Sequence, residues 1–486
     1  MSFFANARKS LMHPKSKMQI PLIILVLILQ SHILPFSHCK SIVKNLPSFS
    51  GDLPFTLETG YVGVGKHEEA QLFYYFVESQ RNPQKDPLFL YLTGGPGTSG
   101  IIPFLFQIVL RVKVVIQNDK NEFLDYSMTI IPKNGKIGRT NIFDKLFALG
   151  PLKFVYTNAT RTDVKLELNP YSWTKTANVI FIDLPVDTGF SYVKANESLK
   201  NSDSLAVTHA CDFIRKWLMD HPKFLNNPLY ITGISYMGLF IPRVISYIYD
   251  GNDRGILPQL NIKGFLIVSP LTDKFIDFNS RTVFAYRAAL IEDELYKPAK
   301  ENCRGKYINV DPNNTLCLNS LKPINEDSIY EFSNTWANKK SVRQALHIRK
   351  GTVENFQFSN SSISDLPGDS HSIYYTHDIY SSLAYHRQLL TKECQALIIN
   401  GDHDMTFPYV GTQKWIKSLK LRVETPWKPW FVHNQVAGYE KTYSKAKYSM
   451  KYATIKGAGH SVALYKPEEA MVILETWLAS HTNSTK

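Results

Sequence analysis

The sequence lacks the features that identify several large classes of protein. No internal repeat is evident, and no arginine-rich run interleaved with aromatic residues indicates nucleic-acid binding, although the formal net charge is +13. After residue 39, no apolar run is long enough to span a membrane. These absences favour a folded globular protein, and 44% hydrophobic residues in a chain of 486 are ample for a large core.

Cysteine is scarce, with five residues in the whole chain. Residues 1–39 hold a basic section followed by the apolar run Ile20 to Leu29, which has the length of a secretory signal peptide. We predict cleavage near residue 39. Secretion makes the remaining cysteines candidates for disulfides, and Cys303 and Cys317 are the expected pair because they bracket a short turn-rich loop.

N-glycosylation sequons fit the same route. Each sequon alone is weak evidence, because three-residue matches are common by chance. The predicted sites are Asn158, Asn196, Asn313, Asn360 and Asn483. Together with the signal peptide they predict an extracellular or vacuolar protein of the secretory pathway, with no membrane association once the signal is removed.

Short apolar runs alternate with helical patterns along most of the chain, which predicts the α/β class with a mixed, mostly parallel sheet and helices on both faces. The expected strands are 57–62, 71–77, 87–92, 178–182, 229–231, 262–268, 396–400 and 452–455. Helical spacing is expected over 206–218 and 239–248, and from Pro467 onward. Glycines between the first two strands predict a hairpin there in preference to a nucleotide-binding loop.

The alternation also divides the chain. Residues 40–279 and 386–486 are the predicted two parts of the core, and the polar, turn-rich segment 280–385 is predicted as a cap inserted between them. Residues 110–145 interrupt the first part with an atypical Lys-, Asn- and Gly-containing stretch. This stretch is either a real loop or a retained intron, and the sequence does not decide between them.

The hexapeptide Gly233 to Gly238 is the most informative motif, because it places Ser235 between glycines. It follows an apolar strand-like run and precedes a helical pattern, so the serine is expected at a strand-to-helix turn. The glycines relieve crowding where the chain reverses, and the serine oxygen stands at the end of a sheet strand. The motif predicts a nucleophile that forms a covalent ester during acyl chemistry.

Two later motifs supply the base and the acid that a serine nucleophile needs. The run Asp402-His403-Asp404 follows one predicted strand, and His460 lies on a glycine-rich loop after another. Ser235, Asp404 and His460 therefore occur in the order serine, acid, histidine that α/β-hydrolases use. His403 adjoins the acid and has little room to orient, so His460 is the predicted base. The acidic run is an alternative metal site, disfavoured because no matching ligand cluster is visible elsewhere; we predict no cofactor.

A tetrahedral intermediate also needs hydrogen-bond donors for its oxyanion. The run Gly94 to Gly97 follows an early strand, where hydrolases place one such donor. The expected donors are the Gly95 N–H and the N–H of Tyr236, the residue after the nucleophile. A tight turn alone would also explain the glycines, but the functional interpretation requires that turn too.

At this point the chain resembles the serine carboxypeptidase-like proteins of plants, from about Ser41 onward and excepting Leu110 to Lys145. The matching pieces are Leu57 to Val64, Leu92 to Gly97, Glu167 to Trp173, Gly189 to Tyr192, Gly233 to Gly238, Gly401 to Asp404 and Gly459-His460. The resemblance implies an α/β-hydrolase fold with a cap. It also implies the triad and oxyanion hole just named, Asp404 in preference to Asp402, and the bridge between Cys303 and Cys317.

The residues expected to contact substrate are Thr93, Gly94 and Ile234, and two of these, Thr93 and Ile234, depart from the family's peptidases. Those enzymes hold a peptide's terminal carboxylate with an Asn before the Gly-Gly pair and with two glutamates. The matching residues here are Thr93 (before Gly94), Ala148 and Ile234, none of which can share a proton with a carboxylate. Thr93 resembles the acyltransferase branch, which moves an acyl group from a glucose ester to an alcohol, whereas Ile234 departs from both branches.

We therefore predict an acyl-enzyme at Ser235 that passes an acyl group from a glucose ester to an alcohol acceptor. One alternative is a serine carboxypeptidase that hydrolyses C-terminal peptide bonds. The other is a secreted binding protein with a decayed site, motivated by Ile234, by the insertion, and by Met237 where the family has a small residue. The expected partner is a small ester or a peptide.

Overall fold

The computed structural model describes residues 40–105, 114–117, 123–126, 149–156, 164–194, 200–321, 338, 340–349, 351–353 and 375–482. The predicted signal peptide, most of the 110–145 insertion and four of the sequons (Asn158, Asn196, Asn360 and Asn483) lie outside these ranges. The sequon at Asn313 lies within them, and this residue is exposed. In the described part of the chain, no helix has the length and apolar character needed to cross a membrane.

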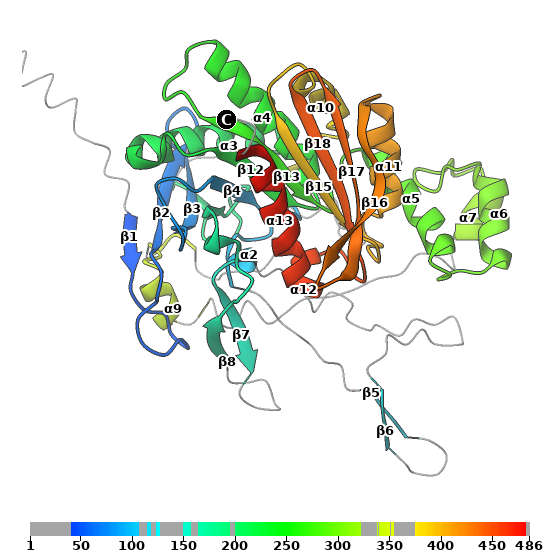
Figure 1. Cartoon of the computed structure of the whole chain (residues 1–486), viewed down its shortest axis with the longest axis horizontal. Helices are drawn as coiled ribbons and strands as arrows, with labels where there is room; N and C mark the ends of the chain where they lie inside the picture. The colour runs from blue at the N-terminus through cyan, green and yellow to red at the C-terminus, as the bar shows by residue number, and fades with distance from the viewer. Residues whose placement is uncertain are drawn as a thin grey trace, which may run out of the picture. The chain divides into compact units, whose positions relative to one another are not determined.

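A twelve-stranded mixed sheet forms the centre of the fold (Figure 1). In sheet order its strands are β1 (Lys40–Val43), β2 (Leu57–Val64), β3 (Ala70–Val77), β9 (Asn178–Ile182), β4 (Leu88–Leu92), β12 (Leu229–Ile234), β13 (Ile262–Val268), β15 (Gln395–Gly401), β18 (Tyr448–Ile455), β17 (Gln435–Lys445) and β16 (Arg422–Val432), with β10 (Tyr192–Val193) beside β3. The strands from β9 to β18 run parallel, and antiparallel strands flank them at both ends.

Two-stranded pairs lie outside this sheet: β11 (Asn201–Ser202) with β14 (Tyr375–Thr376), β5 (Val114–Gln117) with β6 (Phe123–Tyr126), and β7 (Leu152–Tyr156) with β8 (Val164–Leu168). The β11–β14 pair is parallel and joins residues far apart in sequence. It therefore attaches the end of the predicted cap segment to the start of a core helix.

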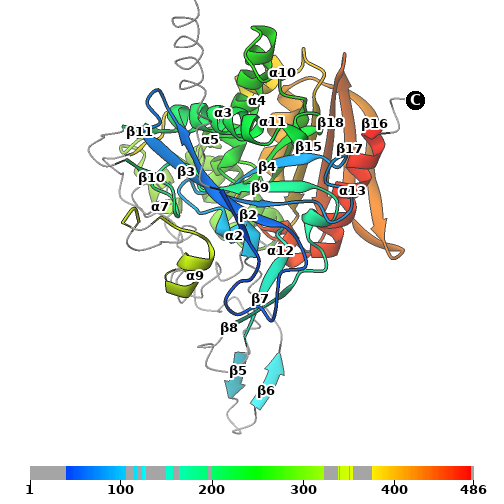
Figure 2. The ribbon, with the colours of Figure 1, turned by 90° about the vertical axis from the view of Figure 1, so that its left-hand side faces the viewer.

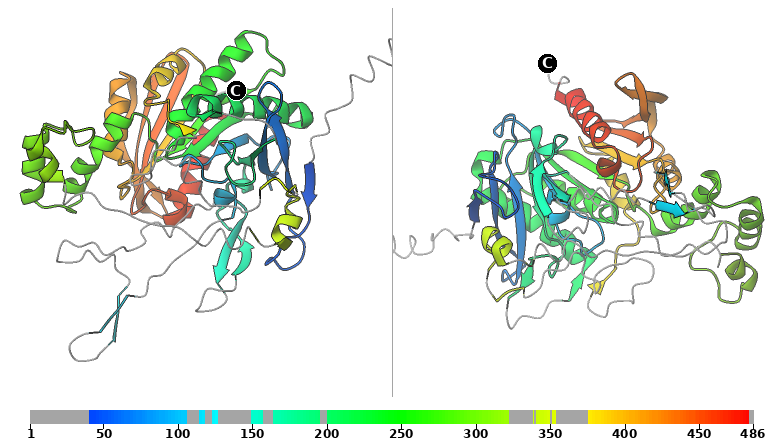
Figure 3. Two further views of the ribbon diagram at one scale, coloured as in Figure 1. Left: turned by 180° about the vertical axis from the view of Figure 1, so that it is seen from behind. Right: turned by 90° about the horizontal axis from the view of Figure 1, so that it is seen from below.

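Helices cover both faces of the sheet (Figures 2 and 3). One face carries α3 (Asp203–Asp220), α4 (Met237–Asp253), α10 (Leu383–Leu389) and α11 (Tyr409–Ser418). The other carries α2 (Ile101–Leu105), α9 (Lys340–Ala345), α12 (Val462–Tyr465) and α13 (Pro467–Thr482). Alternate residues of β3 serve the two faces: Phe73 and Tyr75 pack in one core, and Leu72 and Tyr74 in the other. The predicted α/β class, with helices on both faces, is confirmed.

The described part of the predicted cap segment is mostly helical. Helix α5 (Lys274–Arg287) runs into it and is followed by α6 (Asp293–Cys303) and α7 (Thr315–Leu321). Cys303 and Cys317 form a disulfide bond with an S–S distance of 2.00 Å. The bridge lies in a small apolar cluster with Ala299, Tyr307 and Leu321, so α6 and α7 have a core of their own.

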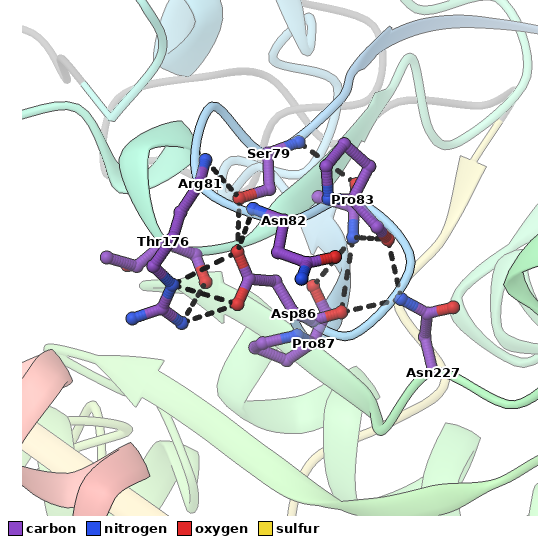
Figure 4. Close-up of polar contacts among 9 residues, drawn as sticks. Ser79, Arg81, Asn82, Pro83, Asp86, Pro87, Thr176 and Asn227 are labelled. Carbon is purple, nitrogen blue, oxygen red and sulfur yellow. Dashed lines mark hydrogen bonds and ion pairs between the residues drawn. The ribbon is translucent and has the colours of Figure 1, made fainter.

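A buried polar network fixes the edge of the sheet at which β4, β9 and β12 begin (Figure 4). The carboxylate of Asp86 accepts hydrogen bonds from Ser79 Oγ at 2.5 Å, Arg81 Nε at 3.0 Å and the Asn82 N–H at 3.0 Å. The side-chain amide of Asn227 donates to the carbonyl of the same Asp86 at 2.7 Å. This edge is opposite the one at which β12 ends, so the network has a stabilising role away from the predicted site.

Replacement of Asp86 by alanine is expected to lower the free energy of unfolding by about 3 kcal/mol, because three donors lose a largely buried acceptor. Urea unfolding followed by circular dichroism measures the loss. Asp253→Ala is the matched control: it removes a surface ion pair with Lys392 at 2.6 Å, which is expected to cost under about 1 kcal/mol. Equal losses in the two variants would contradict a special role for the Asp86 network.

Candidate active site

Ser235 lies at the turn between β12 and α4, in the middle of the parallel strands. Its φ is +62°, a left-handed backbone conformation that costs a non-glycine residue on the order of 1 kcal/mol. The surrounding backbone holds this conformation: the Ser235 N–H donates to the Val268 carbonyl at 2.9 Å, and the Ser235 carbonyl accepts from the Leu271 N–H at 2.9 Å. The predicted strand-to-helix turn therefore has the strained geometry of a nucleophile elbow.

The glycines around Ser235 are required by close backbone approaches. A Cβ on Gly233 would overlap the carbonyl oxygen of Leu92 on β4, and a Cβ on Gly238 would overlap that of Leu271. Met237, one residue from the latter glycine, is fully buried in the apolar core shared with α3 and α4. The elbow thus accommodates the methionine as a core residue.

His460 and Asp404 form a direct pair. His460 Nδ1 lies 2.9 Å from Asp404 Oδ2, and the side chain of Asp404 is buried while that of His460 is 21% exposed. The other carboxylate oxygen accepts from the N–H groups of Thr406 and Phe407 at 2.8 and 3.2 Å. Because a carboxylate only accepts, Nδ1 is the donor in this pair, which leaves Nε2 for the predicted role of base.

The two neighbours of Asp404 in the acidic run face elsewhere. Asp402 accepts a hydrogen bond from the Gly457 N–H at 2.7 Å and so braces the loop that carries His460. His403 is 72% exposed at its side chain, and its Nε2 lies 3.8 Å from the Asp402 carboxylate. Within the described ranges, no three His, Cys, Asp or Glu side chains gather as metal ligands.

The predicted nucleophile and the predicted base are not joined: no hydrogen bond links Ser235 to His460, both of which are described residues. Their strands β12 and β18 are separated in the sheet by β13 and β15. In unliganded hydrolases this bond is often long and tightens only when substrate binds. The structure thus pairs His460 with Asp404 but not with Ser235.

The glycine run after β4 lies directly against the elbow. A Cβ on Gly94 would come within 2.6 Å of Ser235 Cβ and 3.2 Å of the Tyr236 nitrogen. Gly95 has a φ of +154°, which L side chains rarely adopt. The chain from Gly94 to Gly95 and the N–H of Tyr236, at the start of α4, thus lie side by side next to Ser235.

A buried aspartate that sequence reasoning missed anchors this glycine loop. Asp183, at the end of β9, accepts hydrogen bonds from Ser99 Oγ at 2.5 Å and from the N–H groups of Gly100 and Phe190 at 2.7 Å each. Burial raises the pKa of Asp183 to about 7. Asp183 therefore fixes the chain at Ser99 and Gly100, after the glycine run and before α2 and the insertion.

The predicted substrate contacts Thr93 and Ile234 lie at neighbouring positions, because Thr93 follows β4, Ile234 ends β12, and Leu92 pairs with Gly233. Both are only 1% exposed. Ile234 belongs to the apolar core that also contains Val268, and Thr93 Oγ1 has no hydrogen-bond partner among the described residues. Ala148 lies outside the described ranges.

The chain is similar to known proteins over most of its length. Residues 47–113, 142–334 and 328–480 match the model of the serine carboxypeptidase family, which leaves 114–141 unmatched. Serine carboxypeptidase-like 2 of Arabidopsis thaliana is 38% identical over 98% of both chains, and serine carboxypeptidase-like 1 is 40% identical over 90% of this chain and 92% of its own. The crystal structure of Kex1Δp, a prohormone-processing carboxypeptidase of Saccharomyces cerevisiae, superposes with a TM-score of 0.62 over 88% of this chain and 92% of its own, at 18% identity. This likeness confirms the α/β-hydrolase fold.

Proposed function

This chain belongs to the serine carboxypeptidase family, and from that premise we propose that it is an acyltransferase that passes an acyl group from a glucose ester to an alcohol. The observation that carries the proposal is the preformed His460–Asp404 pair at 2.9 Å, together with Ser235 at a strained strand-to-helix turn. Family membership supports hydrolase-type chemistry, and the side chains beside the nucleophile support the choice of substrate.

In the proposed first half-reaction, Ser235 Oγ attacks the ester carbonyl while His460 Nε2 takes the hydroxyl proton. The N–H groups of Gly95 and Tyr236 donate to the oxyanion of the tetrahedral intermediate. His460 then returns the proton to the departing sugar oxygen, which leaves an acyl group on Ser235. In the second half-reaction an alcohol attacks this ester, His460 takes the alcohol proton, and the proton returns to Ser235. Asp404 holds the imidazole in the productive tautomer throughout.

The buried pair Thr93 and Ile234 supports an ester in preference to a peptide. A free peptide C-terminus is a carboxylate, and a site that excludes water without donors for that charge binds it poorly. Thr93 has one hydroxyl and Ile234 has no polar side-chain atom, so the proposed site favours an uncharged group at this position. The acyl portion of a sugar ester meets this requirement.

Turnover of a 1-O-acyl glucose and of a blocked dipeptide, compared at equal enzyme concentration, tests the choice of substrate. We expect glucose release from the ester, faster with an alcohol acceptor present, to exceed dipeptide cleavage by at least about 100-fold in kcat/KM, which is roughly 2.7 kcal/mol of discrimination. Faster cleavage of the dipeptide would instead establish the second candidate, a carboxypeptidase. That candidate is favoured by the likeness to the yeast structural relative, which is a carboxypeptidase.

A fluorophosphonate probe separates both enzyme hypotheses from a decayed binding protein. We expect the folded, glycosylated wild-type protein to be labelled at Ser235, since the elbow, the base and the acid are all present. A folded protein that resists labelling would contradict both enzyme hypotheses.

We also propose passage through the secretory pathway, because the Asn313 sequon is exposed and the Cys303–Cys317 bridge is formed.

A further inference from the structure

A second buried acid lies behind the elbow and is not used by the proposed mechanism. Asp203, the first residue of α3, has a fully buried side chain. Its Oδ2 accepts from the hydroxyl of Tyr236 at 3.0 Å and from the Ile379 N–H at 3.1 Å, and its Oδ1 accepts from the hydroxyl of Tyr375 at 2.9 Å. One of these donors, Tyr236, is the residue whose N–H is the proposed oxyanion donor.

Asp203 therefore joins the elbow to a distant part of the chain. Tyr375 lies on β14 and pairs with Asn201 on β11, directly before α3. A few residues later, Ser382 Oγ donates to the carbonyl of Gly238 in the first turn of α4, at 2.7 Å. The segment from Tyr375 to Ser382 is thus fastened to the elbow at two points, and the carboxylate of Asp203 is the point that reaches Tyr236.

Charged and titratable groups from α5 and from the loop after β14 lie near this carboxylate. Lys274 on α5 holds its ammonium 5.5 Å from the ring centroid of Tyr236, and its charge favours ionised Asp203. From the loop after β14, His377 Nδ1 lies 3.0 Å from the Tyr236 hydroxyl and 3.9 Å from Asp203 Oδ1. Asp378 accepts from the Ser204 N–H at 2.9 Å and adds a second negative charge nearby.

Counting protons shows which form of Asp203 fits the network. An ionised carboxylate only accepts, so it can take all three donors at once. The single proton of the Tyr236 hydroxyl then points at Asp203, and the contact with His377 is satisfied by an Nδ1–H that donates to the phenol oxygen. Protonated Asp203 would add a donor where three donors already converge, and as a neutral acid it would accept these hydrogen bonds more weakly than the carboxylate does. Burial raises the pKa of Asp203 to about 6, which brings this change into the range of mildly acidic pH.

We infer that Asp203 is a positioning residue: through the Tyr236 hydroxyl it holds the Tyr236 N–H toward the oxyanion, and its ionised form alone does so. This inference rests on the proposed function, because it concerns the acylation of Ser235. The direction of the expected pH dependence follows from these hydrogen bonds. Positioning is present above the pKa of Asp203, where the carboxylate is ionised, and is lost as the pH falls through that value.

The test is the rate constant for fluorophosphonate labelling of Ser235 in purified wild-type protein and variants. At about pH 7.5 we expect Asp203→Asn and Tyr236→Phe each to be labelled about tenfold more slowly than wild type, with no further loss in the double variant. Tyr230→Phe is the matched control. It also removes a largely buried tyrosine hydroxyl, which donates to Gln395 at 2.8 Å near the other end of β12, and it is expected to stay within about twofold of wild type.

The pH dependence distinguishes positioning from a general loss of structure. The ratio of the wild-type rate to the Asp203→Asn rate is expected to fall from about ten toward one as the pH drops from about 7.5 to about 5, because the asparagine does not titrate. If Asp203→Asn does not fold, as judged by thermal melting, the wild-type to Tyr236→Phe ratio is expected to show the same fall.

Two results would overturn the inference. In the first, the wild-type protein is labelled, but the ratio of its rate to the Asp203→Asn rate is near one at every pH, or is tenfold and does not change with pH. Either ratio would refute positioning by ionised Asp203 and leave the proposed function standing. A folded wild-type protein that is not labelled at all would overturn the proposed function, and this inference with it.

Discussion

Asp404→Asn is expected to lower the rate constant of acylation at Ser235 by about 10⁴-fold, the size of effect seen when a triad histidine loses its orienting carboxylate. The physical reason is the tautomer of His460. Asp404 accepts from Nδ1 at 2.9 Å, whereas the amide of an asparagine can donate to Nδ1 and drive the proton to Nε2. A proton on Nε2 removes the lone pair that must accept the serine proton. Stopped-flow measurement of product release from an activated ester gives this rate constant.

Substitutions of the two residues before Asp404 are the controls for this prediction. His403→Gln changes an exposed side chain that lies against Asp402, and it is expected to remain within about twofold of wild type. Asp402→Asn keeps an oxygen that can accept from the Gly457 N–H, so it is expected to lose under about tenfold. If Asp402→Asn lost as much activity as we expect for Asp404→Asn, while Asp404→Asn stayed active, the acid would have been misassigned.

The core strands could be predicted closely because they are buried on both faces. Every residue of β4, β9 and β12 is buried, so these strands stand out in the sequence as continuous apolar runs. The strand expected at 178–182 coincides with β9, and the strand expected at 262–268 coincides with β13. The candidate motifs then follow from position, because Ser235 comes directly after β12, and Asp404 and His460 come a few residues after β15 and β18.

The long hairpin of β16 and β17 was not predicted, and its exposure explains why. Most residues of β16 are exposed on both faces, so the strand shows no alternation of apolar and polar residues. It also contains Pro426 and Pro429, and prolines in a sequence run argue against predicting a central strand there. β16 is an edge strand of the sheet, where prolines are tolerated and oppose pairing with other molecules.

The two buried aspartates behind the glycine loop and the elbow could not be predicted for a different reason. Asp183 and Asp203 are identified by what they contact, and their partners come from distant segments, as Ser99 and Tyr375 show. In the sequence, Asp183 is one polar residue after a strand, and Asp203 is an ordinary acid at the start of a helix. Spacing along the chain carries no signal for such contacts.

Ile234→Glu restores a glutamate at the position where the family's peptidases carry one, and we expect it to destabilise this protein by at least about 4 kcal/mol near neutral pH. Ile234 is 1% exposed and belongs to an apolar core, so the new carboxylate would be buried without a partner. Burial raises the folded-state pKa of such a group above its unfolded value of about 4.3. The folded state then binds more protons than the unfolded state, so the loss of stability grows as the pH rises from about 4.5 to about 7.5.

Urea unfolding at the two pH values measures this dependence, and two further variants isolate its cause. Ile234→Gln has nearly the same shape as the glutamate without a charge, so its cost is expected to be smaller and independent of pH. Ile234→Leu keeps the volume and is expected to cost under about 1.5 kcal/mol. A stable Ile234→Glu protein that cleaved a blocked dipeptide would show instead that the neighbourhood of Thr93 can hold a carboxyl group. The residue at position 234 would then be the single change that separates this site from a peptidase. The expected loss of stability would mean instead that the core around Ile234 is packed in a way that leaves no place for a carboxylate-binding glutamate.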